Sequence, residues 1–368
     1  MNATNFILAL AMPLLTVVLS ACTRDGDTIY LPYPASPMAT APLVTVIYNA
    51  DGLGDRSYND LIYHGVEQAA REHSLRTMQL VPQTYDEGKA YLQNMFQTVA
   101  ATKSDTVRRL YLVCAAGYDD YIRQNCHVFA ENPNADLLYF ETPDPLPEAC
   151  GSTLYLPYYG AMYEAGAITP IYNAQALLIG ANPVDQTVAG AIQGFNDGFN
   201  TDYFEPPLEW YEEKHSHTSY LSQEAGQGYS TADSTAIRLV EDNIASEFSF
   251  YTPILVPICG GASNKFHYFV DVFGTFTIVG VDVDPLKTTC PIAAVKHIDR
   301  AVEHCVAQWL SPEGMPHHQV LGLQSGYTEA IYHYYHPMDQ EYFESYIDED
   351  LYQQIHDDAV RKEEEYEK

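Results

Sequence analysis

The chain has 368 residues, of which 46% are hydrophobic, so it is long enough for two domains and apolar enough for globular cores. Its 49 Asp and Glu residues outnumber its 18 Lys and Arg residues, which gives a formal net charge of −31. Because a field of this sign repels nucleic acid and anionic lipid surfaces, neither is expected as a binding partner.

The first 21 residues are typical of a lipoprotein export signal. An apolar run over residues 6–20 is too short for a transmembrane helix, and it leads into the sequence LSAC at residues 19–22. This is the lipobox pattern, in which the Cys is acylated and the chain is cut before it. We therefore expect a lipid anchor at Cys22 and a location in the cell envelope, although the leader contains no Lys or Arg. The alternative is an ordinary cleaved signal followed by an incidental Cys.

Residues 22–41 are polar and rich in Pro, which predicts an extended tether. Export makes disulfides possible among the six later cysteines, although the sequence alone does not give their pairing. Cys114 and Cys259 lie in apolar runs and are expected to be buried thiols. No spacing of cysteines suggests a zinc site, so no metal is expected.

Strands and helices alternate from residue 43 onward. The β-branched run LVTVIY at residues 43–48 is typical of a buried parallel strand. Further strands are predicted at 78–82, 110–114, 137–140, 176–179, near 209–210, at 253–259 and at 277–281. Helices are predicted at 60–73, 91–101, 119–130, 155–168, 187–199, 232–245 and 292–310. This alternation predicts an α/β fold of parallel sheets covered on both faces, with enough strands for two doubly wound lobes.

Two segments interrupt this pattern. Pro143, Pro145 and Pro147 come close together and suggest a boundary between lobes. Residues 346–368 are acidic and end in RKEEEYEK, so they are expected to form a solvated helix or a frayed tail.

The turn after the first strand is the most informative segment for function. Residues 49–65 read NADGLGDRSYNDLIYHG, and Gly52 and Gly54 permit a tight backbone there. In doubly wound sheets, ligands bind at the carboxyl ends of strands and beside helix N-termini. Tyr58 would present an aromatic face at this place. No phosphate-binding motif is present, and the alternative is a capped turn without a ligand.

The same segment resembles a known family. DRSYN followed by a helix with Gly65 is similar to the D-K-S-F-N…G signature of the basic membrane protein lipoproteins, the purine nucleoside receptor A-like proteins. Further similarities follow in the family's order at 181–199 (ANPVDQTVAGAIQGFNDGF), 257–264 (PICGGASN), 279–285 (VGVDVDP), Lys296 with Asp299, and 320–326 (VLGLQSG). The resemblance spans roughly residues 43–331.

The resemblance implies a type I periplasmic-binding fold, with two lobes joined by a hinge of three chain crossings. The first lobe would hold residues 42–145 and 292–315, and the second would hold residues 150–291 and 318–345. Cys150 and Cys290 would then lie near adjacent crossings, and we expect a disulfide between them.

The resemblance also implies a set of ligand-binding residues, namely Asn49, Tyr58, Asn59, Tyr229, Gly260, Asp282 and Lys296. Tyr58 would stack on a purine, as aromatic side chains do with bases. Asp282 would accept hydrogen bonds from the ribose diol, and Lys296 could neutralise a buried carboxylate. Asn49 stands where many members have Asp. From the residues alone, Asp282 could instead cap a turn, Lys296 could lie on a solvated helix face, and Tyr229 could serve packing only.

The function expected from these residues is capture of a small ligand, a purine nucleoside or an analogue, for import by an ABC transporter permease. No cofactor and no catalytic residue are expected. The histidine pairs near 215 and 317 do not share a helix face, and the pair His333 and His336 lacks a third ligand, so no metal site is expected from them. Asp282 and Asp284 are too close in sequence for the opposed roles of a glycosidase pair. The alternative is a surface lipoprotein of the same fold with a sensing or adhesive role. A nucleoside hydrolase is disfavoured because no Asp-rich cluster follows the first strand.

Overall fold

The computed structural model describes residues 40–368 except for 51, 56, 115, 205–213, 231–232, 249–251, 274–276, 283–289 and 333–345. The predicted leader, the anchor at Cys22, nearly all of the tether and the strand near 209–210 lie outside the described residues. Within the described ranges, no helix is long and apolar enough to cross a membrane.

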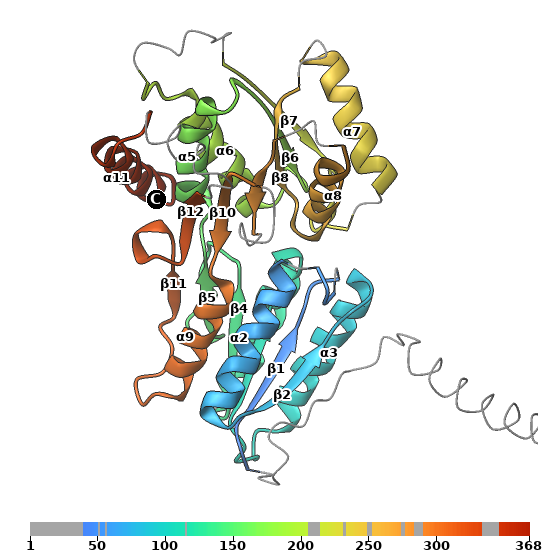
Figure 1. Cartoon of the computed structure of the whole chain (residues 1–368). Helices are drawn as coiled ribbons and strands as arrows, with labels where there is room; N and C mark the ends of the chain where they lie inside the picture. Colours follow the sequence, from blue (N-terminus) through green and yellow to red (C-terminus); the bar gives the residue numbers. More distant parts are fainter. Residues whose placement is uncertain are drawn as a thin grey trace, which may run out of the picture.

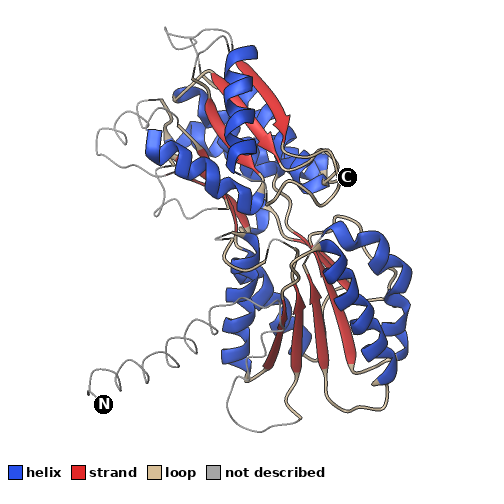
Figure 2. Ribbon diagram, turned by 90° about the vertical axis from the view of Figure 1, so that its right-hand side faces the viewer, coloured by secondary structure: helices blue, strands red, loops and turns tan. Residues whose placement is uncertain are grey.

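The first lobe is built on one parallel sheet of six strands, in the order β11-β5-β4-β3-β1-β2. The strands are β1 (Leu43–Ile47), β2 (Arg76–Leu80), β3 (Arg109–Val113), β4 (Ala135–Phe140), β5 (Ser152–Tyr155) and β11 (His318–Val320). Helices α2 (Tyr58–His73) and α9 (Ile298–Leu310) cover one face, and α3 (Tyr85–Ala101) and α4 (Asp119–Asn125) cover the other. Figure 2 shows this sheet between its helices.

Residue spacing explains how the helices of this lobe attach to the sheet. The buried side chains of α2 include Ile62, Val66 and Ala69, which recur three or four residues apart and form one apolar stripe. Gly65 lies on the same helix, where a Cβ would be 2.5 Å from the carbonyl oxygen of Asp299 in α9. The two helices therefore approach each other closely because this position has no side chain.

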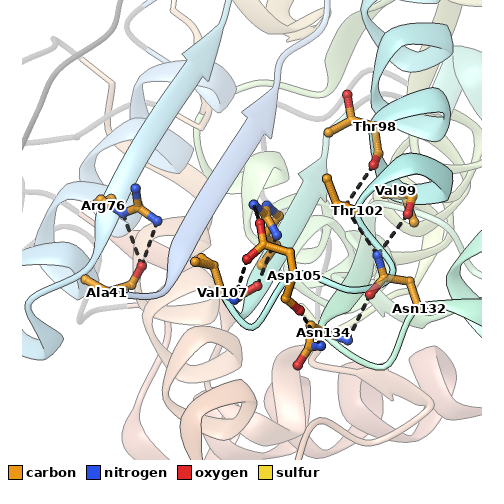
Figure 3. A network of polar contacts seen from close by, with 10 residues as sticks. Ala41, Arg76, Thr98, Val99, Thr102, Asp105, Val107, Asn132 and Asn134 are labelled. Carbon is orange, nitrogen blue, oxygen red and sulfur yellow. Dashed lines mark hydrogen bonds and ion pairs between the residues drawn. The ribbon is translucent and has the colours of Figure 1, made fainter. Parts of the chain in front are cut away.

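The amino ends of the strands in the first lobe are fixed by polar contacts (Figure 3). The Arg76 guanidinium donates to the carbonyl oxygen of Ala41 at 3.1 and 2.9 Å. The Asn132 amide donates to the Val99 carbonyl at 2.8 Å, and Asn134 donates to the Asp105 carbonyl at 2.8 Å. These contacts secure the edge of the sheet that lies away from the carboxyl ends of its strands.

The second lobe contains two short sheets that adjoin each other. Strands β6 (Gln175–Gly180), β7 (His215–Tyr220) and β8 (Ile254–Ile258) are parallel in the order β7-β6-β8. A parallel bridge between Leu255 and Ile278 leads to β9 (Val279–Val281), β10 (Ile292–Lys296) and the antiparallel β12 (Thr328–Tyr332). The helices are α5 (Tyr159–Ile168), α6 (Gln186–Asn200), α7 (Asp233–Ser246), α8 (Ser263–Phe273) and α11 (Glu349–Tyr366).

The described chain passes between the two sheet systems three times (Figure 1). It crosses at residues 156–158 after β5, at His297 between β10 and α9, and at residues 321–327 between β11 and β12. The α/β prediction with two lobes and a hinge of crossing segments is confirmed.

Three strands lie in a different lobe from the one predicted for their residues. β5 pairs with β4 and therefore belongs to the first lobe, although the second lobe was predicted to begin at residue 150. Residues 292–296 form β10 of the second lobe rather than the start of a long helix in the first. β11 pairs with β5 in the first lobe, not in the second. A short apolar run such as IAAVK reads equally well as strand or helix, and no Gly or Pro separates it from α9.

The predicted disulfide between Cys150 and Cys290 is wrong. Cys150 is bonded to Cys126, with the Cα atoms 5.1 Å apart. Cys126 follows α4 and Cys150 precedes β5, so the bridge lies within the first lobe. Cys290 is a buried thiol whose Sγ lies 3.6 Å from Nδ1 of His267 in the second lobe. Position near a crossing therefore did not bring the two cysteines together. Cys114 and Cys259 are buried thiols, as predicted.

The acidic C-terminal segment is not a frayed tail, because α11 packs against α5 (Figure 1). Ile355 and Ala359 are fully buried and lie on the same face of α11. The Tyr366 ring stacks on the Tyr159 ring with the centroids 4.7 Å apart. Most of the charged residues that indicate a solvated segment occupy the other faces of an amphipathic helix, but Glu363 is buried on the same face as Ile355 and Ala359.

Candidate functional site

A cavity of about 140 Å³ lies between the two lobes, where the carboxyl ends of their strands face each other. In α/β folds of this kind, that edge of the sheet is where ligands bind. Six of the seven predicted ligand-binding residues line the cavity, namely Asn49, Tyr58, Tyr229, Gly260, Asp282 and Lys296. The fold therefore brings Asn49 and Lys296, which are about 250 residues apart in the sequence, to the same cavity.

The seventh predicted residue, Asn59, lies behind the cavity wall. It is fully buried, and its amide nitrogen donates to Oδ1 of Asn49 at 2.7 Å and to the carbonyl oxygen of Gly52 at 2.9 Å. Asn59 therefore orients Asn49 instead of facing the cavity itself. The sequence alone does not distinguish this supporting role from a ligand contact, because Asn49 and Asn59 flank the same turn.

Asp55 organises the turn between β1 and α2. Its carboxylate accepts hydrogen bonds from the backbone amides of Ser57, Asn59 and Asp60 at 3.0, 2.9 and 3.2 Å. Burial raises the pKa of Asp55, and these three amides oppose that rise. The carboxylate thus satisfies amides at the start of α2 that have no partner within the helix. The turn holds Tyr58 at the cavity wall.

Tyr58 and Tyr158 place two unsatisfied hydroxyl groups in this region. Within the described residues, neither hydroxyl oxygen has a hydrogen-bond partner, and both oxygens are buried. Burial raises the pKa of Tyr58 well above its usual value, so the group stays protonated. Each hydroxyl therefore keeps an unused capacity to donate one hydrogen bond and to accept others.

Lys296 forms a buried ion pair with Glu141 across the lobes. The ammonium nitrogen lies 2.9 Å from both carboxylate oxygens, and the two side chains are 2% and 7% exposed. It also lies 4.2 Å from the centre of the Tyr158 ring. Burial raises the pKa of Glu141, while Lys296 opposes the rise. The hydroxyl of Thr187 completes the carboxylate's partners at 3.3 Å.

Glu141 is not among the predicted ligand-binding residues, because it belongs to no recognisable motif. It follows the apolar run LLYF, so its place at the end of a predicted strand was the available signal. The predicted place of Lys296 on a helix is wrong, since Lys296 is the last residue of β10. The expectation that Lys296 neutralises a buried carboxylate holds for Glu141, 155 residues away.

Asp282 lies at the end of β9 with a positive φ of 54°. Its Oδ1 accepts a hydrogen bond from the backbone amide of Lys296 at 3.3 Å. Burial raises the pKa of Asp282 to about 7, against the lowering effect of Lys296, and Glu141 adds to the rise. At neutral pH this carboxyl group can therefore act as a donor or as an acceptor.

Tyr229 faces the cavity from the second lobe. Its hydroxyl donates to Oδ2 of Asp185 at 2.5 Å. A Cβ at Gly260 would lie 3.1 Å from the Tyr229 ring, and Gly260 has a positive φ of 53°. The ring therefore packs over the backbone at the end of β8, which fixes its orientation.

Acidic groups outnumber basic groups among the described residues that line the cavity. Four carboxyl groups line the cavity, those of Asp55, Glu141, Asp185 and Asp282, whereas Lys296 is the one cation among the described lining residues. That cation is already paired with Glu141. The described part of the chain also contains no group of side chains suited to a metal ion. Such a lining favours neutral or cationic ligands over anionic ones.

The lobes also touch at the mouth of the cavity. The Asn264 amide at the start of α8 donates to the carbonyl oxygen of Asp55 at 2.5 Å. The backbones of Gly117 and Gly226 meet from opposite lobes, since a Cβ at Gly117 would lie 3.7 Å from the Gly226 Cα. The structure therefore represents a closed arrangement of the lobes.

No protein-family model and no curated protein sequence matches the chain. Solved structures do match. An ABC transporter solute-binding protein from Aeropyrum pernix is similar with a TM-score of 0.62 and 13% identity over 88% of this chain and 92% of that one. A transcriptional activator of the comK gene from Bacillus halodurans gives 0.61 and 13% over 88% and 98%. A carbohydrate transporter solute-binding protein from Agrobacterium radiobacter, in complex with D-arabinose, gives 0.53 and 12% over 85% and 100%. At this identity the similarity establishes the type I periplasmic-binding fold alone.

Proposed function

We propose that the chain is a solute-binding protein of the cell envelope, which captures a small polar ligand between its lobes and presents it to an ABC importer. The observation that carries this proposal is the cavity itself, because its walls come from both lobes and combine aromatic faces with buried polar groups. A ligand that touches both lobes stabilises the closed arrangement, which is the differential contact that closure requires. The solute-binding proteins among the similar structures support this role.

We propose a purine nucleoside or a close analogue as the ligand. Tyr58 and Tyr229 offer aromatic faces from opposite lobes, and Asp282 offers a carboxyl group for a sugar diol. The resemblance to the basic membrane protein lipoproteins supports the same choice. The acidic lining disfavours nucleotides, because a phosphate would meet four carboxyl groups and no unpaired cation among the described lining residues.

Binding is a better interpretation of the site than catalysis. Glu141 is paired with Lys296, Asp55 accepts three backbone amides, and Asp185 accepts the Tyr229 hydroxyl. Glycoside hydrolysis needs two carboxyl groups placed on either side of the scissile bond. Because the other three carboxyl groups are already held by these partners, none of them is free to form such a pair with Asp282.

Calorimetry with adenosine, guanosine, inosine and their free bases tests the proposed ligand. Tyr58→Ala should weaken nucleosides and bases alike by about 1–3 kcal/mol, since it removes a stacking face. Asp282→Asn should weaken nucleosides by about 1.5–3 kcal/mol and leave free bases unchanged, since it removes a charge-assisted acceptor for the sugar. Asn suits this position because it tolerates a positive φ.

Tyr268→Ala is the matched control for the loss of a tyrosine, because Tyr268 lies on α8 with 71% of its surface exposed. It should bind as wild type does. If the wild-type protein binds none of these compounds at millimolar concentration, the nucleoside proposal fails. Binding of one of them with a sensing output and no transport would favour the alternative role.

We further propose that the mature protein is anchored through a lipid on Cys22. Cys22→Ser should release the protein from the membrane fraction or leave the leader uncut, because the thiol is the acylation site of the LSAC pattern. Thr23→Ser, one residue further along, should fractionate as wild type does. Membrane fractionation and the intact mass of the mature chain measure both effects, and an unchanged Cys22→Ser protein would contradict the anchor.

A further inference from the structure

The first and third crossing segments lie against each other at the hinge. The first crossing, residues 156–158, leads directly into α5, and the third crossing, residues 321–327, runs between β11 and β12. A Cβ at Gly322 in the third crossing would lie 2.8 Å from Cγ of Pro157 in the first. Rotation of one lobe against the other must change backbone angles in these segments.

One buried carboxylate from the C-terminal helix joins the start of α5, just after the first crossing, to the third crossing. Oε2 of Glu363 accepts the backbone amide of Gly160 at 2.7 Å, and Oε1 accepts the amide of Leu323 at 2.8 Å. Gly160 lies in the first turn of α5, directly after the first crossing, and Leu323 lies inside the third. Glu363 is 6% exposed. Its two oxygens thus tie together segments that are 163 residues apart in sequence, from Gly160 to Leu323.

The local sequence leaves space for this carboxylate. A Cβ at Gly160 would lie 2.7 Å from Oε2 of Glu363, and a Cβ at Gly322 would overlap Oε1. Both positions are glycine, so the backbones of the two segments reach the carboxylate directly. The contact therefore depends on both glycines as well as on Glu363 and the Leu323 amide, and a side chain at either glycine would displace the carboxylate.

The rest of α11 is fixed to the second lobe. Nδ1 of His356 lies 2.6 Å from Oε1 of Glu164, which is buried in α5. The Tyr203 hydroxyl donates to Asp358 at 2.9 Å, and Tyr366 stacks on Tyr159. The helix therefore moves with the second lobe, and Glu363 is its connection to the third crossing.

We propose that α11 is a hinge brace, in which Glu363 holds the third crossing against the start of α5 in the arrangement that closes the lobes. The two hydrogen bonds persist only while the crossings keep their present spacing. Loss of the carboxylate then shifts the equilibrium between the lobes toward an open arrangement. This inference assumes that the lobes move relative to each other, but it does not depend on the identity of the ligand.

Glu363→Gln tests the brace in ligand-free, full-length protein. Glutamine keeps the shape but turns an amide group toward one of the two backbone N–H groups, so one hydrogen bond is lost. Glu364→Gln is the control, because Glu364 is the next residue on the helix and is exposed. Spin labels on Gln97 and Glu241, which are exposed on α3 and α7 in opposite lobes, report the distance between the lobes.

We expect Glu363→Gln to raise the ratio of open to closed molecules at least fivefold and to speed exchange of the Gly160 and Leu323 amides at least tenfold. Glu364→Gln should change neither. Faster amide exchange with unchanged interlobe distances would overturn the brace, because Glu363 would then act only as a cap for α5. Unchanged exchange would overturn it as well.

If Glu363→Gln folds poorly, a second variant and a measurement on the wild-type protein still test the brace. Glu363→Asp keeps the charge but is too short to reach both amides, so it should open the hinge in the same direction. In the wild-type protein, the Gly160 and Leu323 amides should show one common free energy of opening, because one opening event releases both. Clearly different opening free energies would overturn the proposal. These readouts need no ligand, so failure of the proposed function would leave them intact.

Discussion

Lys296→Met is expected to lower the free energy of unfolding by about 3–5 kcal/mol at neutral pH, because it leaves the Glu141 carboxylate buried without its cation. The ammonium lies 2.9 Å from both oxygens of Glu141, and neither side chain has appreciable exposure. Methionine keeps most of the length and volume of the lysine chain, so the loss reflects the charge more than a cavity. Denaturant unfolding with the midpoint and slope fitted together measures it.

The pH dependence of this loss has a defined sign. Without Lys296, Glu141 loses the neighbour that opposes the burial-driven rise of its pKa. A folded-state pKa raised above the unfolded value of about 4.3 means that protonation favours the folded state. The deficit of Lys296→Met should therefore be largest at pH 7 and above, and should shrink as the pH falls toward about 4.3. A deficit that stays constant between pH 5 and pH 8 would contradict the explanation.

Two further variants isolate the buried pair. Lys103→Met removes an ammonium that is paired with Glu131 on the surface, with 44% and 60% of these side chains exposed. Its unfolding midpoint should match that of wild type, since exposed pairs contribute little. Adding Glu141→Gln to Lys296→Met should recover part of the loss, because the uncompensated charge is then removed. Equal losses for the two lysine variants would mean that burial of the pair is not the cause.

The fold was predictable from the sequence because its central strands are β-branched or apolar runs bounded by turn residues. β7 carried no such signal, since HSHTSY is polar and lies at an edge of its sheet. β10 was hidden by the apolar spacing of α9, which follows after a single residue. The sequence of α11 favours a solvated helix or a tail because its charges outnumber the few buried residues of its inner face.

The site was predictable where a residue follows a strand within a recognisable pattern, as Tyr58 and Asp282 do. It was not predictable where the partner comes from a distant segment. Glu141 and Lys296 are 155 residues apart, and nothing in either segment indicates the other. Glu363 likewise has a role that depends on two backbone amides, which every segment of a sequence contains. Pairings of this kind are set by topology, not by local residue pattern.

The packing of α5 against α6 leads to the last prediction. Gly166 in α5 and Gly194 and Gly198 in α6 lie where the two helix backbones touch, and a Cβ at any of them would overlap a carbonyl oxygen of the other helix. Every residue of α5 is buried, so the helix cannot shift into solvent to relieve such an overlap. Backbone atoms also cannot rotate away as a side chain can.

Gly198→Ala is therefore expected to lower the free energy of unfolding by about 3 kcal/mol or more, at the upper end of the cost of overpacking a core. Intrinsic helix propensity acts in the opposite direction and favours Ala over Gly by about 1 kcal/mol. Gly190→Ala in the same helix separates the two effects, since its Cβ would meet only the Tyr366 ring at 3.2 Å. That variant should remain within about 1 kcal/mol of wild type in the same denaturant experiment. If Gly198→Ala were as stable as Gly190→Ala, the close contact between the two helices would not be limiting, and the helix that carries the Gly160 amide would have room to move.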